Sequence, residues 1–122
     1  ASLIKKLKMK NCVFCKITND HLRKVIYEND NFFSVPDINP VVKGHSLVMP
    51  KKHFKTILDI PDSLGAELLD CVKKTALKIV KETKLEGFNV VSNNFSAAGQ
   101  VVDHAHFHII PRKKGDGLKL VG

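Results

Sequence analysis

Tryptophan is absent from the 122-residue sequence, tyrosine occurs once, and aromatic residues make up only 7% of the chain. Proteins that bind single-stranded nucleic acid stack bases on aromatic side chains interleaved with basic ones. This sequence offers no such interleaving, so nucleic acid is not an expected partner. No apolar run approaches the length of about 18 residues that a membrane span needs, and the first residues do not resemble a signal peptide. We therefore expect no membrane partner and a cytoplasmic location.

Cysteine is scarce, and the three cysteines do not suggest a disulfide framework, because their number is odd and no export signal precedes them. Cys71 lies among apolar residues at helical spacing, so we expect it to be a packing residue. Cys12 and Cys15 form a C-x-x-C pair, which could bind zinc, act as a redox pair or simply pack. The lysine-rich residues before the pair do not resemble the strand that a redox motif requires, so half of a structural zinc site is favoured.

Acidic residues are few, since 12 Asp and Glu stand against 20 Lys and Arg, which gives a formal charge of +8. A basic surface attracts anions such as nucleotides, nucleic acid or phospholipid headgroups. Much of the excess lies at the two ends and along one predicted helix, as expected for solvated surfaces and tails. The charge therefore indicates a class of ligand and not a function.

The apolar pattern predicts one domain of the α+β class, since 122 residues suffice for a single core. After a basic lead-in over residues 1–10, the spacing of apolar residues changes from strand-like to helical and back. Strands are predicted over residues 25–27, 32–35, 45–50, 88–94 and 104–110, and one long helix over residues 62–83, with Gly87 just past its end. We expect an antiparallel sheet of about five strands with this helix packed on one face.

The segment "HAHFHII" at residues 104–110 places a histidine at every second position. On a strand, His104, His106 and His108 would share one face at intervals of roughly 6.6 Å, while the residues between them face the core. The outer two would lie roughly 13 Å apart, whereas zinc–nitrogen bonds are about 2.0 to 2.1 Å long. One zinc ion therefore cannot take all three histidines.

Two histidines from outside the C-x-x-C pair would complete a tetrahedral zinc site. His53 and His104 are the candidates, whereas His21 lies in a polar stretch and is expected at the surface. His106 and His108 then remain for a second task. A neutral imidazole, with an ordinary pKa of about 6.5, is a competent nucleophile toward phosphorus.

A loop suited to phosphate precedes the histidines. Gly99 allows the backbone to approach an anion closely, and the side chains of Asn93 and Gln100 offer amide donors. The sequence therefore predicts a phosphate pocket beside His106 and His108.

These residues match a known family pattern. "GQVVDHAHFHIIPR" resembles the motif of the histidine triad (HIT) proteins, "PDINPVVKGHSLVMPKKH" resembles their upstream signature, and "NCVFCKI" resembles the opening of their zinc-containing, bacterial-type members. The matches cover residues 11–111, which we expect to form the HIT domain, followed by a tail over 112–122. The resemblance implies a HIT-like fold and a homodimer that hydrolyses or transfers nucleotides at the α-phosphate. Its substrate would be a purine nucleotide, with adenine expected.

The resemblance also implies a role for each site residue. His106 would attack phosphorus and form a nucleotidyl-histidine that water then cleaves, His108 would bind a non-bridging oxygen, and His45 would orient the nucleophile from behind. Further roles concern the substrate and the metal: Asp37 would hold the ribose hydroxyls, Ile38 would contact the base, Asn93 and Gln100 would bind the phosphate and leaving-group side, and Cys12, Cys15, His53 and His104 would bind a structural zinc.

One position departs from the family pattern. The residue after the Gly-Gln turn is usually Ser or Thr, whereas this chain has Val101, which keeps a backbone N–H but has no hydroxyl. We expect leaving groups that need a proton to be handled less well than in members with the hydroxyl.

Simpler explanations exist for most of these residues. Asp37 could cap its own turn, Ile38 could belong to the core, Asn93 could form a turn, and His45 could be a buried histidine without a catalytic part. A structural role is hardest to defend for His106, because histidines flank it two positions away on either side.

Two other functional classes compete with the nucleotidyl-histidine hydrolase. In a zinc hydrolase, an ion held by the histidines would activate water directly, so that removing the metal would remove activity in proportion. In a nucleotide-binding scaffold protein, a His106→Asn variant would bind nucleotide and keep its cellular role without any covalent species.

Overall fold

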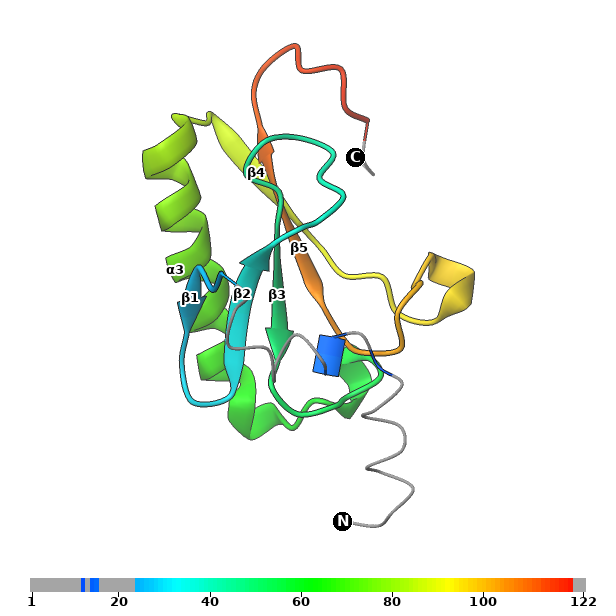
Figure 1. Cartoon of the computed structure of the whole chain (residues 1–122). Helices are drawn as coiled ribbons and strands as arrows, with labels where there is room; N and C mark the ends of the chain where they lie inside the picture. Colours follow the sequence, from blue (N-terminus) through cyan, green and yellow to red (C-terminus); the bar gives the residue numbers. More distant parts are fainter. Residues whose placement is uncertain (1–11, 13, 16–23, 120–122) are drawn as a thin grey trace.

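The computed structural model describes residues 12, 14–15 and 24–119, and its centre is a five-stranded antiparallel sheet. The strand order is β1-β2-β3-β5-β4, so the two strands that follow the helix enter the sheet beside β3 in reverse order. The strands are β1 (Tyr27–Glu28), β2 (Phe32–Pro36), β3 (Ser46–Pro50), β4 (Gly87–Val91) and β5 (Phe107–Arg112). The single long helix among these residues, α3 (Gly65–Thr83), lies on one side of the sheet (Figure 1). The predicted fold class is confirmed.

The helix starts three residues later than the predicted start at residue 62. Two short 3-10 turns, η1 (Ile57–Asp59) and η2 (Asp62–Leu64), precede it, because the N–H of Leu64 bonds to the carbonyl of Pro61. It ends at Thr83 and is capped by Lys84, whose backbone is left-handed (φ 52°) and whose N–H donates to the carbonyl of Val80. Gly87, expected just past the helix end, is instead the first residue of β4. No helix in the described part of the chain is long and apolar enough to span a membrane.

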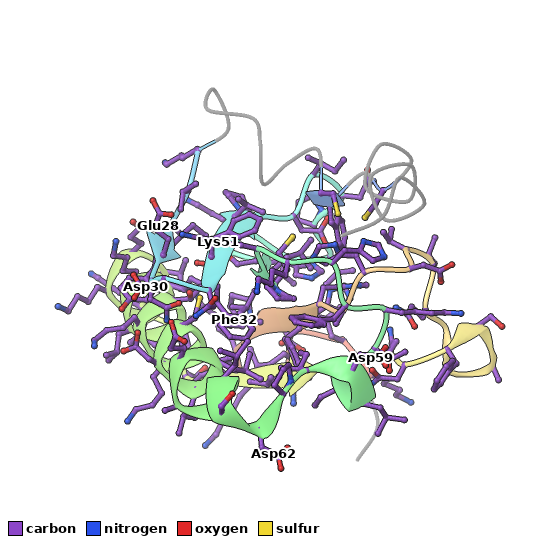
Figure 2. The ribbon with its side chains drawn as sticks, turned by 90° about the horizontal axis from the view of Figure 1, so that it is seen from below. Glu28, Asp30, Phe32, Lys51, Asp59 and Asp62 are labelled. Atoms are coloured by element: carbon purple, nitrogen blue, oxygen red, sulfur yellow. The ribbon has the colours of Figure 1, made fainter. Side chains whose placement is uncertain are left out.

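The core between α3 and the sheet holds the apolar residues that the two periodicities predicted. Cys71, Ala76 and Ile79 from the helix pack against a set of fully or almost fully buried strand residues, namely Phe32, Val48, Phe107 and Ile109. Figure 2 shows Phe32 where β2 meets this core. The expectation that Cys71 is a packing residue is consistent with its complete burial, which raises the pKa of its thiol to about 11.

A second core covers the opposite face of the sheet. Cys12, Phe14 and Cys15 pack there on side chains of β2 and β3, namely Phe33, Val35, Leu47 and Met49. Residues 14–15 accordingly lie across the sheet from α3 in Figure 1. Because His108 pairs with Leu47 and opposed residues of an antiparallel pair share a face, His108 lies on this same face. The sheet therefore separates the face that α3 covers from the face on which Cys12, Cys15 and His108 lie.

The histidine segment is only partly a strand. β5 begins at Phe107, so the prediction of a strand from residue 104 is wrong for its first three residues. Before β5 the backbone turns away from the ladder, since the N–H of His104 bonds to the carbonyl of Val102 (2.8 Å) and the N–H of Ala105 bonds to that of Phe54 (2.6 Å). β1 is likewise shorter than expected, since it starts two residues later than predicted and ends one residue later, at Glu28.

Candidate functional site

Four side chains from three distant segments meet beside the second core. The ligand atoms of Cys12, Cys15, His53 and His104 all lie within 4.8 Å of one another. The Cys15 sulfur lies 3.1 Å from His53 Nδ1 and 3.5 Å from His104 Nδ1, and the Cys12 sulfur lies 3.4 Å from His104 Nδ1. Ligands of a tetrahedral zinc with bonds of about 2.0 to 2.3 Å are separated by similar distances. The structure thus brings together all four predicted metal ligands.

The contacts and the burial of these side chains fit the binding of a metal. His104 Nε2 lies 2.9 Å from the carbonyl of Pro50, which can only accept, so Nε2 carries the proton and Nδ1 presents its lone pair to the thiols. Burial lowers the pKa of His104 to about 4, which keeps the ring neutral, as a metal ligand must be. Burial beside Cys12 raises the pKa of Cys15 to about 12. A divalent cation would reverse that effect, since coordinated thiols are deprotonated.

A second group joins β5 to the loop between β2 and β3. The backbone N–H of Val41 donates to His45 Nδ1 (3.2 Å), so the proton of the neutral ring is on Nε2. That atom lies 2.9 Å from His108 Nδ1 and 3.3 Å from an Asp37 carboxylate oxygen. His108 Nδ1 therefore accepts, and His108 carries its own proton on Nε2. This arrangement leaves His108 as a hydrogen-bond donor to a ligand.

Burial also determines the charge state of this pair. It lowers the pKa of His108 to about 4, with His106 and His45 adding to the shift and Asp37 opposing it. Burial lowers the pKa of His45 as well. Both rings are therefore neutral near pH 7, as the donor chain from Val41 through His45 to His108 requires.

His106 has one nitrogen engaged and one available. Its Nδ1 lies 2.8 Å from the carbonyl of His104, so Nδ1 donates and Nε2 holds the lone pair. In the described part of the chain, Nε2 has no hydrogen-bond partner and no buried side-chain nitrogen or oxygen lacks one, so Nε2 reaches solvent although the residue is only 7% exposed. The rings of Phe14 (4.8 Å) and His108 (5.1 Å) contact the imidazole edge to face. In the neutral ring, this geometry presents a fixed nitrogen with a free lone pair.

The loop before the histidines is closed by Gln100. Its side-chain oxygen accepts the N–H of Phe95 (2.7 Å), and its Nε2 donates to the carbonyls of Lys55 (2.6 Å) and Val102 (2.9 Å). In this conformation both amide hydrogens are used within the protein. Binding of phosphate by this amide, as the resemblance implies, would require one of these bonds to open.

The remaining predicted residues lie around this loop or on the adjoining one. Asn93 approaches Gly99 (φ 92°) and has no hydrogen-bond partner within the described residues. Val101 is 92% exposed and Ile38 is 70% exposed, so Ile38 is not part of the core. Asp37 does cap its own turn, because its second oxygen accepts the N–H of Asn39 (2.9 Å). His21 lies outside the described residues.

The sequence did not single out three side chains that shape the site. Phe14 packs on both His104 and His106, and Lys55 places its ammonium 5.7 Å from the centre of the Phe95 ring. The position of Phe14 inside the C-x-x-C pair was the available signal, whereas nothing in the sequence indicated that Lys55 and Phe95 would meet.

Comparison with known proteins identifies the family. The model of the HIT domain matches residues 19–115. The chain belongs to the HIT domain family. An uncharacterised HIT-like protein of Methanocaldococcus jannaschii is 47% identical over 107 residues, covering 87% of this chain and 82% of that protein. The adenosine 5'-monophosphoramidase HNT1 of Saccharomyces cerevisiae is 37% identical over 91% of this chain and 68% of its own.

Solved HIT structures share the fold. A HIT family protein from Bacillus subtilis superimposes with a TM-score of 0.83 at 40% identity, covering 92% of this chain and 81% of that one. A zinc-bound histidine triad protein from Mycobacterium smegmatis gives a TM-score of 0.78 at 36% identity, with 92% and 82% covered. Among the relatives found by sequence, the adenylylsulfatase HINT3 of Arabidopsis thaliana is 43% identical, but this chain spans only 55% of its length.

Proposed function

We propose that this HIT protein is a nucleotide hydrolase or transferase that acts at the α-phosphate through a nucleotidyl-histidine intermediate. The observation that carries the proposal is the state of His106, whose Nδ1 donates to a backbone carbonyl while its unprotonated Nε2 reaches solvent. HIT relatives named as an adenosine 5'-monophosphoramidase and an adenylylsulfatase act on bonds at the phosphate of adenylate, as their names state. They support a purine nucleotide, with adenine as the base.

The chemistry follows from the tautomers. His106 Nε2 attacks phosphorus, the phosphorus–nitrogen or phosphoanhydride bond to the leaving group breaks, and the ring becomes cationic. The carbonyl of His104, 2.8 Å from Nδ1, stabilises that charge by accepting the Nδ1 proton in a hydrogen bond. The Nε2 proton of His108 is available for a non-bridging oxygen, where negative charge develops. Water then cleaves the phosphorus–histidine bond and regenerates the neutral ring.

The nucleoside would bind on the loop after β2. The exposed Ile38 side chain is available to a base, and Asp37 offers carboxylate oxygens to ribose hydroxyls. One of these oxygens is already held by the N–H of Asn39, which fixes the carboxylate in place. The contact of Asp37 with His45 would link ribose binding to the donor chain that ends at His108.

We propose a structural role for zinc held by Cys12, Cys15, His53 and His104. Four protein ligands close a tetrahedral site, whereas a catalytic zinc keeps one position for water. When bound, the ion would join the N-terminal segment to the segments before and after the loop. His106 and His108 belong to a different set of contacts, which argues against the metal-activated water mechanism.

A homodimer through β4 would account for the apolar surface at this edge of the sheet. Phe88 and Val90 are 44% and 47% exposed, and their β5 partners lie on the helix face. α3 makes its main contacts with β1, β2, β3 and β5 and not with β4. The outer backbone groups of β4 are also unpaired within the described sheet. Exposed apolar edge strands are typical pairing surfaces.

A hydrolysis panel tests the proposal. Wild type should release AMP from adenosine 5'-phosphoramidate or from a dinucleoside polyphosphate, and His106→Asn should reduce kcat by about 10³-fold or more while still binding AMP. Chelation should lower thermal stability without a proportional loss of activity in the protein that stays folded. Activity that tracks metal content instead would favour the zinc hydrolase, and wild type without turnover would favour the scaffold protein.

A further inference from the structure

Phe95 has a backbone conformation that side chains rarely adopt. Its φ of 71° and ψ of 158° lie in a region essentially reserved for glycine. The other described non-glycine residue with positive φ, Lys84, has the ordinary left-handed conformation of a helix end (φ 52°, ψ 39°). Backbone strain of the kind seen at Phe95 persists where the surroundings impose it, and it clusters at functional sites.

The loop does not need the phenyl ring for its own closure. The backbone N–H of Phe95 bonds to the Gln100 side chain, and its carbonyl accepts the N–H groups of Ala98 and Gln100 (both 3.1 Å). A glycine could make the same three hydrogen bonds without strain. The ring itself is not in the core, since Phe95 is 47% exposed. The identity of the side chain therefore requires a reason outside the packing of the loop.

A cation accompanies the ring. The ammonium of Lys55 lies 5.7 Å from the ring centre, within the range of a cation–π contact. The backbone of Lys55 is tied to the same loop by Gln100 Nε2. The loop then continues through the exposed Val101 to His104 and His106, so the phenyl and the ammonium lie on the segments that flank the proposed nucleophile.

We propose that Phe95 and Lys55 form a leaving-group subsite for a nucleoside oligophosphate. The phenyl ring would stack on the base or ribose of the departing nucleotide, and the ammonium would bind its phosphates. This inference rests on the proposed function and adds to it the class of leaving group. It places dinucleoside polyphosphates ahead of substrates with small or cationic amine leaving groups.

The reaction balances without a further reactant. His106 Nε2 forms a bond to the α-phosphorus of diadenosine tetraphosphate, and the bond from that phosphorus to the bridging oxygen breaks. ATP leaves with the bridging oxygen, and its charge is held beside Lys55. Water then attacks the phosphorus and the bond to His106 breaks. AMP leaves with the water oxygen, the ring becomes neutral again, and one proton of the water passes to solvent.

The test compares two substrates with the same adenylate half. We measure kcat/KM for diadenosine tetraphosphate and for adenosine 5'-phosphoramidate, whose leaving group is ammonia, and take their ratio. Phe95→Gly should lower this ratio about tenfold, the factor that one base–aromatic stack commonly contributes. It should also keep or raise the thermal midpoint, because strain is released. Phe95→Tyr should retain the ratio, and Lys55→Gln should lower it.

Lys84→Gly is the matched control, because it also places glycine at a positive φ but lies at the far end of α3. Its ratio should equal that of wild type. An unchanged ratio in Phe95→Gly, an equal fall in Lys84→Gly, or a clear loss of stability in Phe95→Gly would each overturn the subsite. A wild type inactive on both substrates would instead refute the proposed function itself, so the two failures are distinguishable.

Discussion

The histidines at 104, 106 and 108 differ in what their Nδ1 atoms contact. Nδ1 of His104 faces two thiols, that of His106 faces a backbone carbonyl, and that of His108 faces His45. These contacts fix the Nε2–H tautomer in His104 and His108 and the Nδ1–H tautomer in His106, and the tautomer together with the neighbours of the ring decides whether it can bind a metal, attack or donate. The three imidazoles thus have three distinct chemical capacities despite their regular spacing.

The neutrality of His108 predicts a pH dependence of stability. Its pKa is lowered to about 4 in the folded chain and is about 6.5 when unfolded, so between these values the unfolded state binds the extra proton. Stability from this residue is therefore complete above pH 6.5 and is lost as the pH falls toward 4, by at most about 1.4 kcal/mol per pH unit. Urea unfolding should be measured at pH 7, 6 and 5. The unfolding free energy should fall less steeply with decreasing pH in His108→Asn than in wild type. The same pH dependence in both proteins would contradict the lowered pKa of His108. Loss of zinc in acid affects both proteins alike, so it does not change this comparison.

The absence of a hydroxyl at Val101 predicts slow turnover of substrates whose leaving group needs a proton. The side chain is 92% exposed, so a serine fits there without disturbing the core. Val101→Ser should raise kcat on amine-leaving phosphoramidates by about tenfold, below the 10²-fold or more of a fully positioned acid. The gain should be smaller for an anhydride, whose leaving group needs no proton. No gain in turnover on amines would refute the role of the missing hydroxyl.

At the scale of elements, zinc should connect the N-terminal segment to the sheet. Cys15→Ser should lose the metal and about 3 to 4 kcal/mol of unfolding free energy, the linkage expected for zinc at several hundred times its Kd. Cys71→Ser is the matched control, because Cys71 is equally buried but lies against α3, away from the cluster. Elemental analysis should find one zinc per chain in the control and none in Cys15→Ser. Equal metal content in both would contradict the site.

The sequence predicted elements better than their ends. Apolar periodicity located α3 and the five strands, because burial on one face imposes a period of 2 or 3.6. It could not show that β5 starts only at Phe107, since His104 leaves the strand direction to reach thiols that lie 89 and 92 residues earlier in the chain. The motifs predicted that the four candidate metal ligands meet, and the structure places their ligand atoms within 4.8 Å of one another. The strain at Phe95 and the internal use of the Gln100 amide depend on tertiary contacts that no local pattern encodes.

At the scale of the whole molecule, the exposed edge of β4 predicts the oligomeric state. Val90→Lys places a charge in the proposed interface, where it would be buried without a partner, and should convert a dimer into a monomer. Val25→Lys is the control, because Val25 is similarly exposed (41%) but lies beside β1 at the opposite edge of the sheet. Light scattering after size exclusion should give the mass of two chains for wild type and the control. A monomeric wild type would refute the dimer. The cytoplasmic location is a separate prediction, which this measurement does not address.

In the proposed reaction, His106 bonds transiently to the α-phosphorus of the substrate. Wild type should be mixed with adenosine 5'-phosphoramidate, quenched within milliseconds and analysed by intact-mass and peptide mass spectrometry. We predict an adenylate adduct on the peptide that contains His106, which forms and decays at rates consistent with kcat and is absent in His106→Asn. Turnover without any such adduct, or an adduct on another residue, would contradict the assignment of His106 as the nucleophile.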